Sequence, residues 1–336
     1  MSPSSASAPE PPAFQPGRLR LARELRGLNQ TELGTRAGVT SAAISQFEGG
    51  TIPPGPKTLR ALSVALEVPP AFFALDISET HEGFFRSLRR TSIRQRRQAR
   101  ALAYIAHDVA HVEGLKTATI PHIPVPLDAN REEVERVAQD VRREWKLPRG
   151  PIGNVVETLE AHGVVVIRLP FSGEDVDAFS LPFPDWPVVV LAADKNDRGR
   201  SRFDCAHELG HLVMHADQVW GIKEVEQQAH QFAAAFLMPD ADIVDELPSR
   251  ADWPALFELK RKWQVSLAAL LMRARRLDIM TEAAYLAAVK ETSARGWRRV
   301  EPIPLGECEL PSISYDRASA SRSPLELLPS DVVAAL

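Results

Sequence analysis

The apolar residues of this chain follow one pattern before about residue 120 and another after it. Between residues 17 and 76 they recur at helical spacing over short stretches with tight connections, which predicts a small bundle of helices. Further along, the pattern predicts helices over 131–145 and 152–161, buried strands over 164–169 and 188–192, and then mainly helices to about residue 297. We therefore expect an all-α domain followed by a mostly helical α+β domain with a small sheet.

The N-terminal bundle carries signals for two short helices joined by a turn. Asn29 is a good helix N-cap, and Glu32 stands at the capping-box position three residues later. Gly38 lies where a tight turn needs a positive φ, and Thr40 can cap a second helix over 41–48. A helix, a short glycine turn and a second helix form the helix-turn-helix arrangement.

The string from Asn29 to Gly50 resembles the Cro/repressor-type (XRE-like) helix-turn-helix family, over about 55 residues in all. The resemblance implies that Arg23 pairs with Glu48, that the first of the two helices touches a phosphate and that the second faces the major groove. The residues expected to bind DNA are Gln30, Thr40, Ser41, Ala42, Ser45 and Gln46. Recognition helices present base contacts from their N-terminal half, and glutamine can bond adenine bidentately; both agree with this assignment.

Domains of this type usually bind a double-stranded operator as dimers, so we expect a homodimer on DNA. The alternative is a helical bundle that binds protein rather than DNA. Two alanines in the reading helix leave that alternative open, because they offer only apolar contacts.

A second motif, His207-Glu208-Leu209-Gly210-His211, lies inside an apolar run. Residues i and i+4 of a helix share one face, so both imidazoles can bind one metal ion while Glu208 polarises a water molecule. Two histidines leave a zinc ion one protein ligand short. Downstream, apolar residues at helical spacing define one face of a further helix, and Glu226 lies on that face one turn before them. We expect Glu226 to be the third ligand, with Glu224 as the fallback.

These strings together resemble the ImmA/IrrE family of bacterial zinc peptidases. Residues 202–215 match its HExxH signature, and residues 226–239 match its second motif. The resemblance implies a zincin-like peptidase fold over about 150–290, Zn2+ as cofactor, and cleavage of repressor-type DNA-binding proteins under stress or in mobile-element control. One position departs from the family pattern: the family usually has Asn or Asp where this chain has His230. His230 could hydrogen-bond a metal ligand, join the metal, or weaken catalysis.

The expected reaction is metal-assisted peptide hydrolysis, in which Glu208 takes a proton from the zinc-bound water and passes it to the leaving amine. The tetrahedral oxyanion needs a stabilising group, for which His215, His230 and Arg202 are candidates. For His215 the simpler expectation is a surface position at the end of a helix.

The composition of the chain limits how it can bind DNA and indicates the compartment in which it acts. A net charge of −4 gives no global basic field, so DNA binding must be local. The 2 cysteines lie far apart, which favours a reducing cytoplasm over a disulfide framework. Residues 1–15 lack the pattern of a signal peptide, and no apolar run approaches the ~20 residues of a membrane span. We expect a cytoplasmic protein without a membrane partner.

Two basic stretches allow more than one interpretation. Residues 86–100 could add phosphate contacts, but arginine far outnumbers lysine throughout, which favours an exposed face of a linking helix. Residues 265–276 could form a second helix-turn-helix, but no base-reading polar residues line the first turn of that helix. This favours a helix that packs against the peptidase core.

The expected domains are a disordered tail (1–16), a DNA-binding domain (17–76), a helical connector (77–120), a peptidase domain with following helices (121–300) and a Pro/Ser-rich tail (301–336).

The chain is thus expected to be a DNA-binding transcriptional regulator with a zinc-dependent endopeptidase domain that cleaves itself or a partner repressor. The alternative is a transcription factor whose peptidase-like domain only senses a ligand or partner. A scaffold without either chemistry is a third interpretation. The intact metal motif favours the first, since a sensor need not retain Glu208, whereas His230 and the lack of a visible substrate favour the second.

Overall fold

The structure is a computed structural model that describes residues 14–78, 80, 92–169, 178–194, 197–215 and 222–312. The chain divides into two compact units, the first with residues 14–78 and Ser92–Val112, the second with residue 80 and the described residues between 113 and 312. The tail expected over 1–16 lies almost wholly outside the described residues, as do 79 and 81–91 of the connector and 313–336 of the C-terminal tail. None of the described helices has the length and apolar character needed to cross a membrane.

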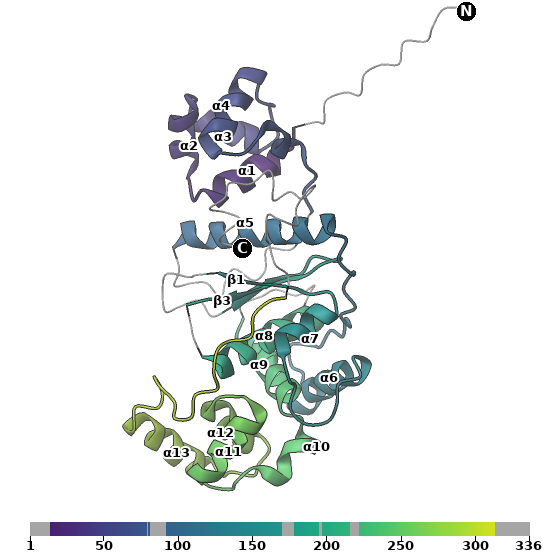
Figure 1. Ribbon diagram of the computed structural model, residues 1–336, viewed down its shortest axis with the longest axis vertical. Coiled ribbons are helices and arrows are strands. Elements are labelled where there is room, and N and C mark those ends of the chain that lie inside the picture. The colour runs from purple at the N-terminus through teal and green to yellow at the C-terminus, as the bar shows by residue number, and fades with distance from the viewer. Residues whose placement is uncertain are drawn as a thin grey trace, which may run out of the picture. The chain divides into compact units, whose positions relative to one another are not determined.

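The first unit is all-helical, as predicted, and its turns follow the signals in the sequence. Its elements are α1 (Pro16–Leu25), α2 (Gln30–Ala37), α3 (Ser41–Glu48), α4 (Pro56–Leu66), the 3-10 helix η1 (Pro70–Ala74) and α5 (Ile93–Val112) (Figure 1). Asn29 and Glu32 form the predicted capping box, Gly38 has φ 68°, and the Thr40 side chain caps α3. These signals are local, and the structure confirms them.

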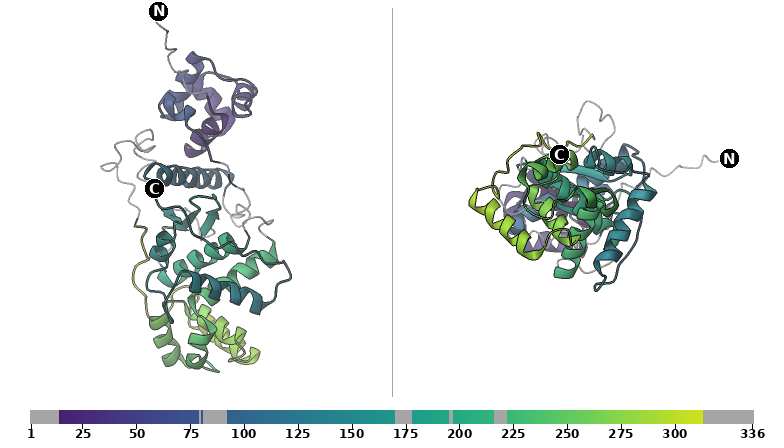
Figure 2. Two further views of the ribbon diagram at one scale, coloured as in Figure 1. Left: turned by 90° about the vertical axis from the view of Figure 1, so that its right-hand side faces the viewer. Right: turned by 90° about the horizontal axis from the view of Figure 1, so that it is seen from below.

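A closed apolar core holds this unit together. Leu19, Leu33, Ile44 and Leu62 come from four different helices and are all fully buried. The long helix α5 runs without a break over 20 residues and packs against α1 (Figures 1 and 2). The α5 helix is therefore part of the same compact unit as the helix-turn-helix.

The second unit combines helices with a three-stranded sheet, which confirms the expected class. Its elements are α6 (Arg131–Glu144), α7 (Val155–Ala161), β1 (Val165–Leu169), β2 (Ala178–Leu181), β3 (Val188–Ala192), α8 (Arg198–Met214), α9 (Lys223–Leu237), α10 (Asp240–Ile243), η3 (Val244–Glu246), α11 (Trp253–Trp263), α12 (Leu267–Arg276) and α13 (Glu282–Ala294).

The sheet has the order β1-β3-β2. Val165 of β1 pairs with Val188 of β3 in a parallel ladder, whereas Ala178 of β2 pairs with Leu191 of β3 in an antiparallel one. The sequence pattern did not predict β2, whose four residues are too few to show a period. Helix α8 packs against β2 and β3, α9 packs on α8, and α6 packs on α9.

The helix α12 is a packing element. Its Arg273 is 1% exposed, donates to a carboxylate oxygen of Glu135 at 2.6 Å and donates to the carbonyl oxygen of Met238 at 3.0 Å. A side chain held in this way cannot reach a phosphate, which supports the packing interpretation of residues 265–276.

Candidate metal centre and nucleic-acid interface

The helix α8 carries the whole HExxH motif. It begins at the N-cap Asp197, whose side chain accepts from the Arg200 N–H, and most of its length is buried. Gly210 marks a close approach of α8 to α9, because a Cβ there would lie 2.8 Å from Cδ1 of Phe232. The absence of a side chain at this position lets α9 cross close to the motif and bring Glu226 beside the two histidines.

Three donor atoms from α8 and α9 converge on one point. Nε2 of His207 lies 3.1 Å from Nε2 of His211, and Oε2 of Glu226 lies 3.3 Å and 3.8 Å from these two nitrogens. A tetrahedral zinc ion with bonds of about 2.0–2.1 Å holds its ligand atoms about 3.3 Å apart, so the cluster fits such an ion. The Glu226 carboxylate remains one-third exposed, which leaves one side of the cluster open to solvent.

The acid–base candidate Glu208 points to the sheet side of α8. It is 5% exposed and accepts a hydrogen bond of 2.5 Å from the hydroxyl of Ser180 on β2. Burial raises the pKa of Glu208 to about 7, while the charge of His207 and the Ser180 hydrogen bond act in the opposite direction. A carboxyl group with a pKa near 7 can both accept and release a proton at neutral pH. Ser180 was missed at the sequence level because β2 itself was missed.

His215 is not at the surface, contrary to expectation. It is fully buried, with Nδ1 3.2 Å from Nδ1 of His211 and Nε2 2.9 Å from Oε1 of Gln228. The side chain of α8's C-cap residue turns inward because α9 supplies a polar partner for it. His215 therefore lies behind a metal-ligand candidate and not on the side open to a substrate.

Of the two remaining candidates for the metal site, Glu224 lies away from the cluster and His230 lies beside it. Glu224 is exposed and does not join the cluster. Nδ1 of His230 contacts the carbonyl oxygen of Glu226 at 2.8 Å, and its ring packs edge-to-face against His207 with centroids 4.5 Å apart. His230 thus lies at the rim of the site and supports the helix turn that carries Glu226.

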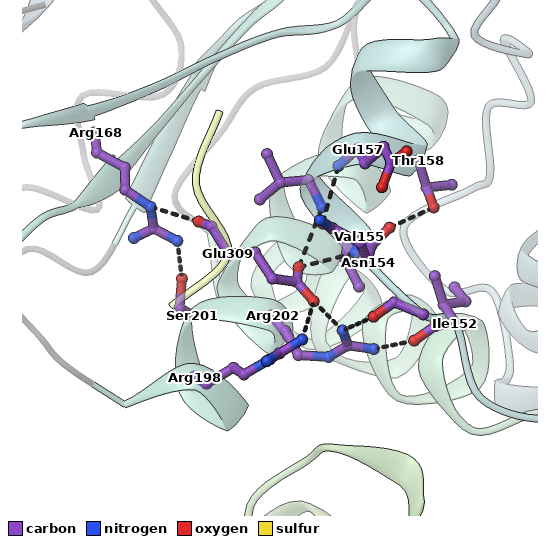
Figure 3. A network of polar contacts seen from close by, with 12 residues as sticks. Ile152, Asn154, Val155, Glu157, Thr158, Arg168, Arg198, Ser201, Arg202 and Glu309 are labelled. Carbon is purple, nitrogen blue, oxygen red and sulfur yellow. Dashed lines mark hydrogen bonds and ion pairs between the residues drawn. The ribbon is translucent and has the colours of Figure 1, made fainter. Parts of the chain in front are cut away.

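Arg202 is unavailable as an oxyanion stabiliser, which corrects that expectation. It is 1% exposed and forms an ion pair with Glu309 from the segment after α13 (Figure 3). The Glu309 carboxylate also accepts from the backbone N–H of Val155 at 2.8 Å, and its backbone carbonyl oxygen accepts from Arg168 at 2.9 Å. Part of the expected C-terminal tail is therefore anchored to the start of the metal-bearing helix, the N-terminus of α7 and the sheet.

In the first unit, five of the six residues expected to contact DNA are exposed together at α3, and the sixth, Gln30, is half-buried. Thr40, Ser41, Ala42, Ser45 and Gln46 are all exposed at α3. Behind α3, Arg23 forms the expected pair with Glu48 through bonds of 2.6 and 2.9 Å, and Gln30 donates to the same carboxylate at 2.9 Å. This buried pair joins α1 to α3 and fixes the orientation of the exposed face.

Fold and sites together define a helix-turn-helix unit joined to a zincin-like unit. Residues 19–73 match the family model described as helix-turn-helix, and residues 159–275 match the peptidase family model described as the IrrE N-terminal-like domain. The chain is thus a fusion of an XRE-like helix-turn-helix domain with an ImmA/IrrE-type peptidase-family domain, which confirms both resemblances. No curated protein matches the chain.

Proposed function

We propose that this chain is an operator-binding transcriptional regulator with an active zinc endopeptidase domain, which cleaves itself or a partner repressor, for example in a stress response. It would act in the cytoplasm as a homodimer, where the helix-turn-helix unit meets DNA. The proposal rests on one observation above all: His207, His211 and Glu226 present three donor atoms at the spacing of a zinc tetrahedron, beside a buried carboxylic acid.

Each side chain has a distinct task in the proposed reaction. A bound zinc ion would supply Lewis acidity, which polarises a peptide carbonyl and acidifies water. His207, His211 and Glu226 would hold the ion, and the exposed side of Glu226 leaves room for substrate. Glu208 would accept a proton and release it to the leaving amine, with Ser180 holding one carboxylate oxygen in place.

The peptidase half of the proposal is tested with the wild-type chain, Glu208→Gln and Glu224→Gln as the matched control on an exposed carboxylate. All three should retain about one zinc per chain, because neither substitution removes a proposed ligand. Each protein is then incubated alone and with repressor-type helix-turn-helix proteins, and products are identified by mass spectrometry. Wild type and Glu224→Gln should give the same product, and Glu208→Gln should give none. Zinc without a Glu208-dependent product would favour the sensor interpretation, and no zinc would refute the site.

The DNA-binding half is tested separately at α3. Gln46 is exposed on α3, the second helix of the helix-turn-helix motif, and a glutamine side chain can read one base pair by two hydrogen bonds. Gln46→Ala should lose about 1–3 kcal/mol of discrimination at one position of the operator, while weak binding to random DNA stays unchanged. Gel shifts against a single-substitution operator set measure this difference. Unchanged selectivity would remove Gln46 from the reading residues.

A further inference from the structure

We propose that His215 and Gln228 are positioning residues that fix the tautomer of His211, so that its Nε2 carries the lone pair a metal ion needs. The inference rests on the proposed zinc function of the site. Three buried side chains form the relay: His211 is 3% exposed, His215 is fully buried and Gln228 is 3% exposed. None of their polar atoms can exchange partners with bulk water at low cost.

The relay starts from two backbone carbonyl groups. Nε2 of Gln228 donates to the carbonyl oxygens of Pro126 at 2.8 Å and Leu127 at 3.2 Å. Carbonyl oxygens only accept hydrogen bonds, so the amide cannot be turned round without placing two acceptors against its own oxygen. Oε1 of Gln228 must therefore face the other way, toward Nε2 of His215 at 2.9 Å.

The next two steps follow from the chemistry of imidazole. Because Oε1 of Gln228 only accepts, Nε2 of His215 carries the proton, and in the neutral ring Nδ1 is then an acceptor. That acceptor lies 3.2 Å from Nδ1 of His211, which must supply the hydrogen. His211 is left with its lone pair on Nε2, the atom that faces His207 and Glu226.

The fixed end of the relay lies outside the segment that matches the peptidase family. The carbonyl groups belong to the proline-rich stretch over 121–127, whereas the match covers residues 159–275. This stretch is held to the end of α8 by the Ile123 N–H, which donates to the carbonyl oxygen of Val213 at 2.9 Å. Residues before the family domain thus orient a ligand inside it.

The other histidine of the motif lacks such support among the described residues, where Nδ1 of His207 is buried with no hydrogen-bond partner. A hydrogen bond on the far nitrogen of a metal-binding histidine fixes its orientation and raises its basicity, and its loss typically weakens metal binding 10–100-fold. We therefore expect the zinc affinity of the whole site to depend on the His211 relay.

The test compares the full-length wild type with Gln228→Leu, which removes the amide but keeps a similar volume, and His215→Phe, which keeps the ring but removes both nitrogens. His162→Phe is the matched control, since His162 stacks on Trp145 outside the metal cluster. Zinc dissociation constants are measured by competition with a chromogenic chelator. In parallel, ring 15N chemical shifts of the metal-free wild type report which nitrogen of His211 carries hydrogen.

We expect zinc to bind about 10–100-fold more weakly to both relay variants, with His162→Phe like wild type. We also expect Nδ1 of His211 to be protonated in the metal-free wild type. Equal zinc affinity in all four proteins, or a proton on Nε2 of His211, would overturn the relay while leaving the proposed function standing. A wild type that binds no zinc would instead refute the proposed function, and the 15N shifts would still decide the tautomer. If Gln228→Leu fails to fold, His215→Phe and the 15N measurement carry the same decision.

Discussion

Removing the Glu309 carboxylate should destabilise the second unit strongly. In the native structure, Glu309 and Arg202 have side chains that are 2% and 1% exposed, and Arg198 lies 3.5 Å from the same carboxylate (Figure 3). In Glu309→Ala, the Arg202 guanidinium would keep its bonds to the carbonyl oxygens of Ile152 and Gly153 but lose its counter-ion. Removing one partner of a buried ion pair costs about 3–5 kcal/mol, because the other charge stays buried.

This free energy is a large part of the total stability of a domain, which is about 5–15 kcal/mol. The unit spans roughly 200 residues, and for a unit of that size each kcal/mol lowers Tm by about 2–4 °C. Glu309→Ala should therefore lower the Tm of the second unit by about 6–20 °C in differential scanning calorimetry. Glu307→Ala is the matched control, because Glu307 lies in the same segment but is exposed, and it should change stability by no more than about 0.5 kcal/mol.

A double replacement tests the physical reason. Changing both Arg202 and Glu309 to Met removes the buried charge together with its partner, so most of the lost stability should return. If the double variant loses as much stability as the Arg202→Met and Glu309→Met single variants added together, the loss comes from packing and not from an orphaned charge. A Tm for Glu309→Ala within about 2 °C of wild type would refute the reasoning altogether.

Two further predictions concern the helix that carries the metal motif. Gly210→Ala should destabilise the unit by about 1–3 kcal/mol in urea titrations, because the new Cβ would overlap the fully buried Phe232 ring; an unchanged midpoint would mean that α9 shifts freely. In the metal-free protein, Ser180→Ala should move the pKa of Glu208 further up from about 7, because burial already raises it and the lost hydrogen bond favoured the charged form. A 13C NMR titration of the carboxyl group measures this, and a midpoint at or below the wild-type value contradicts it. Since this folded pKa lies above the unfolded value, the group destabilises the metal-free fold as the pH rises from about 4.5 to 7.

Local signals in the sequence predicted a large part of the molecule. The capping box at Asn29, the positive φ at Gly38 and the cap at Thr40 depend only on neighbouring residues, and all three are present. The spacing of His207 and His211 places both on one helix face regardless of what surrounds the helix. The helix face that led to Glu226 is likewise a property of one helix, and the structure brings that carboxylate to the two histidines.

The contacts between distant segments could not be predicted in this way. Ser180 lies on a strand of four residues, Gln228 is one of several polar residues on α9, and Glu309 lies in a segment that reads as a tail. No local pattern distinguishes these residues, because each acquires its role from a partner far along the chain: Glu208, His215 and Arg202 respectively.

The sequence by itself determined the helices, their caps and the residue types that can hold a metal ion, since periodicity and capping act over one or two turns. Only the tertiary structure decided which side of His211 faces a hydrogen-bond partner, which carboxylate is buried and which arginine is neutralised. These outcomes depend on desolvation and on the geometry of hydrogen bonds between segments, and both exist only once the chain has packed.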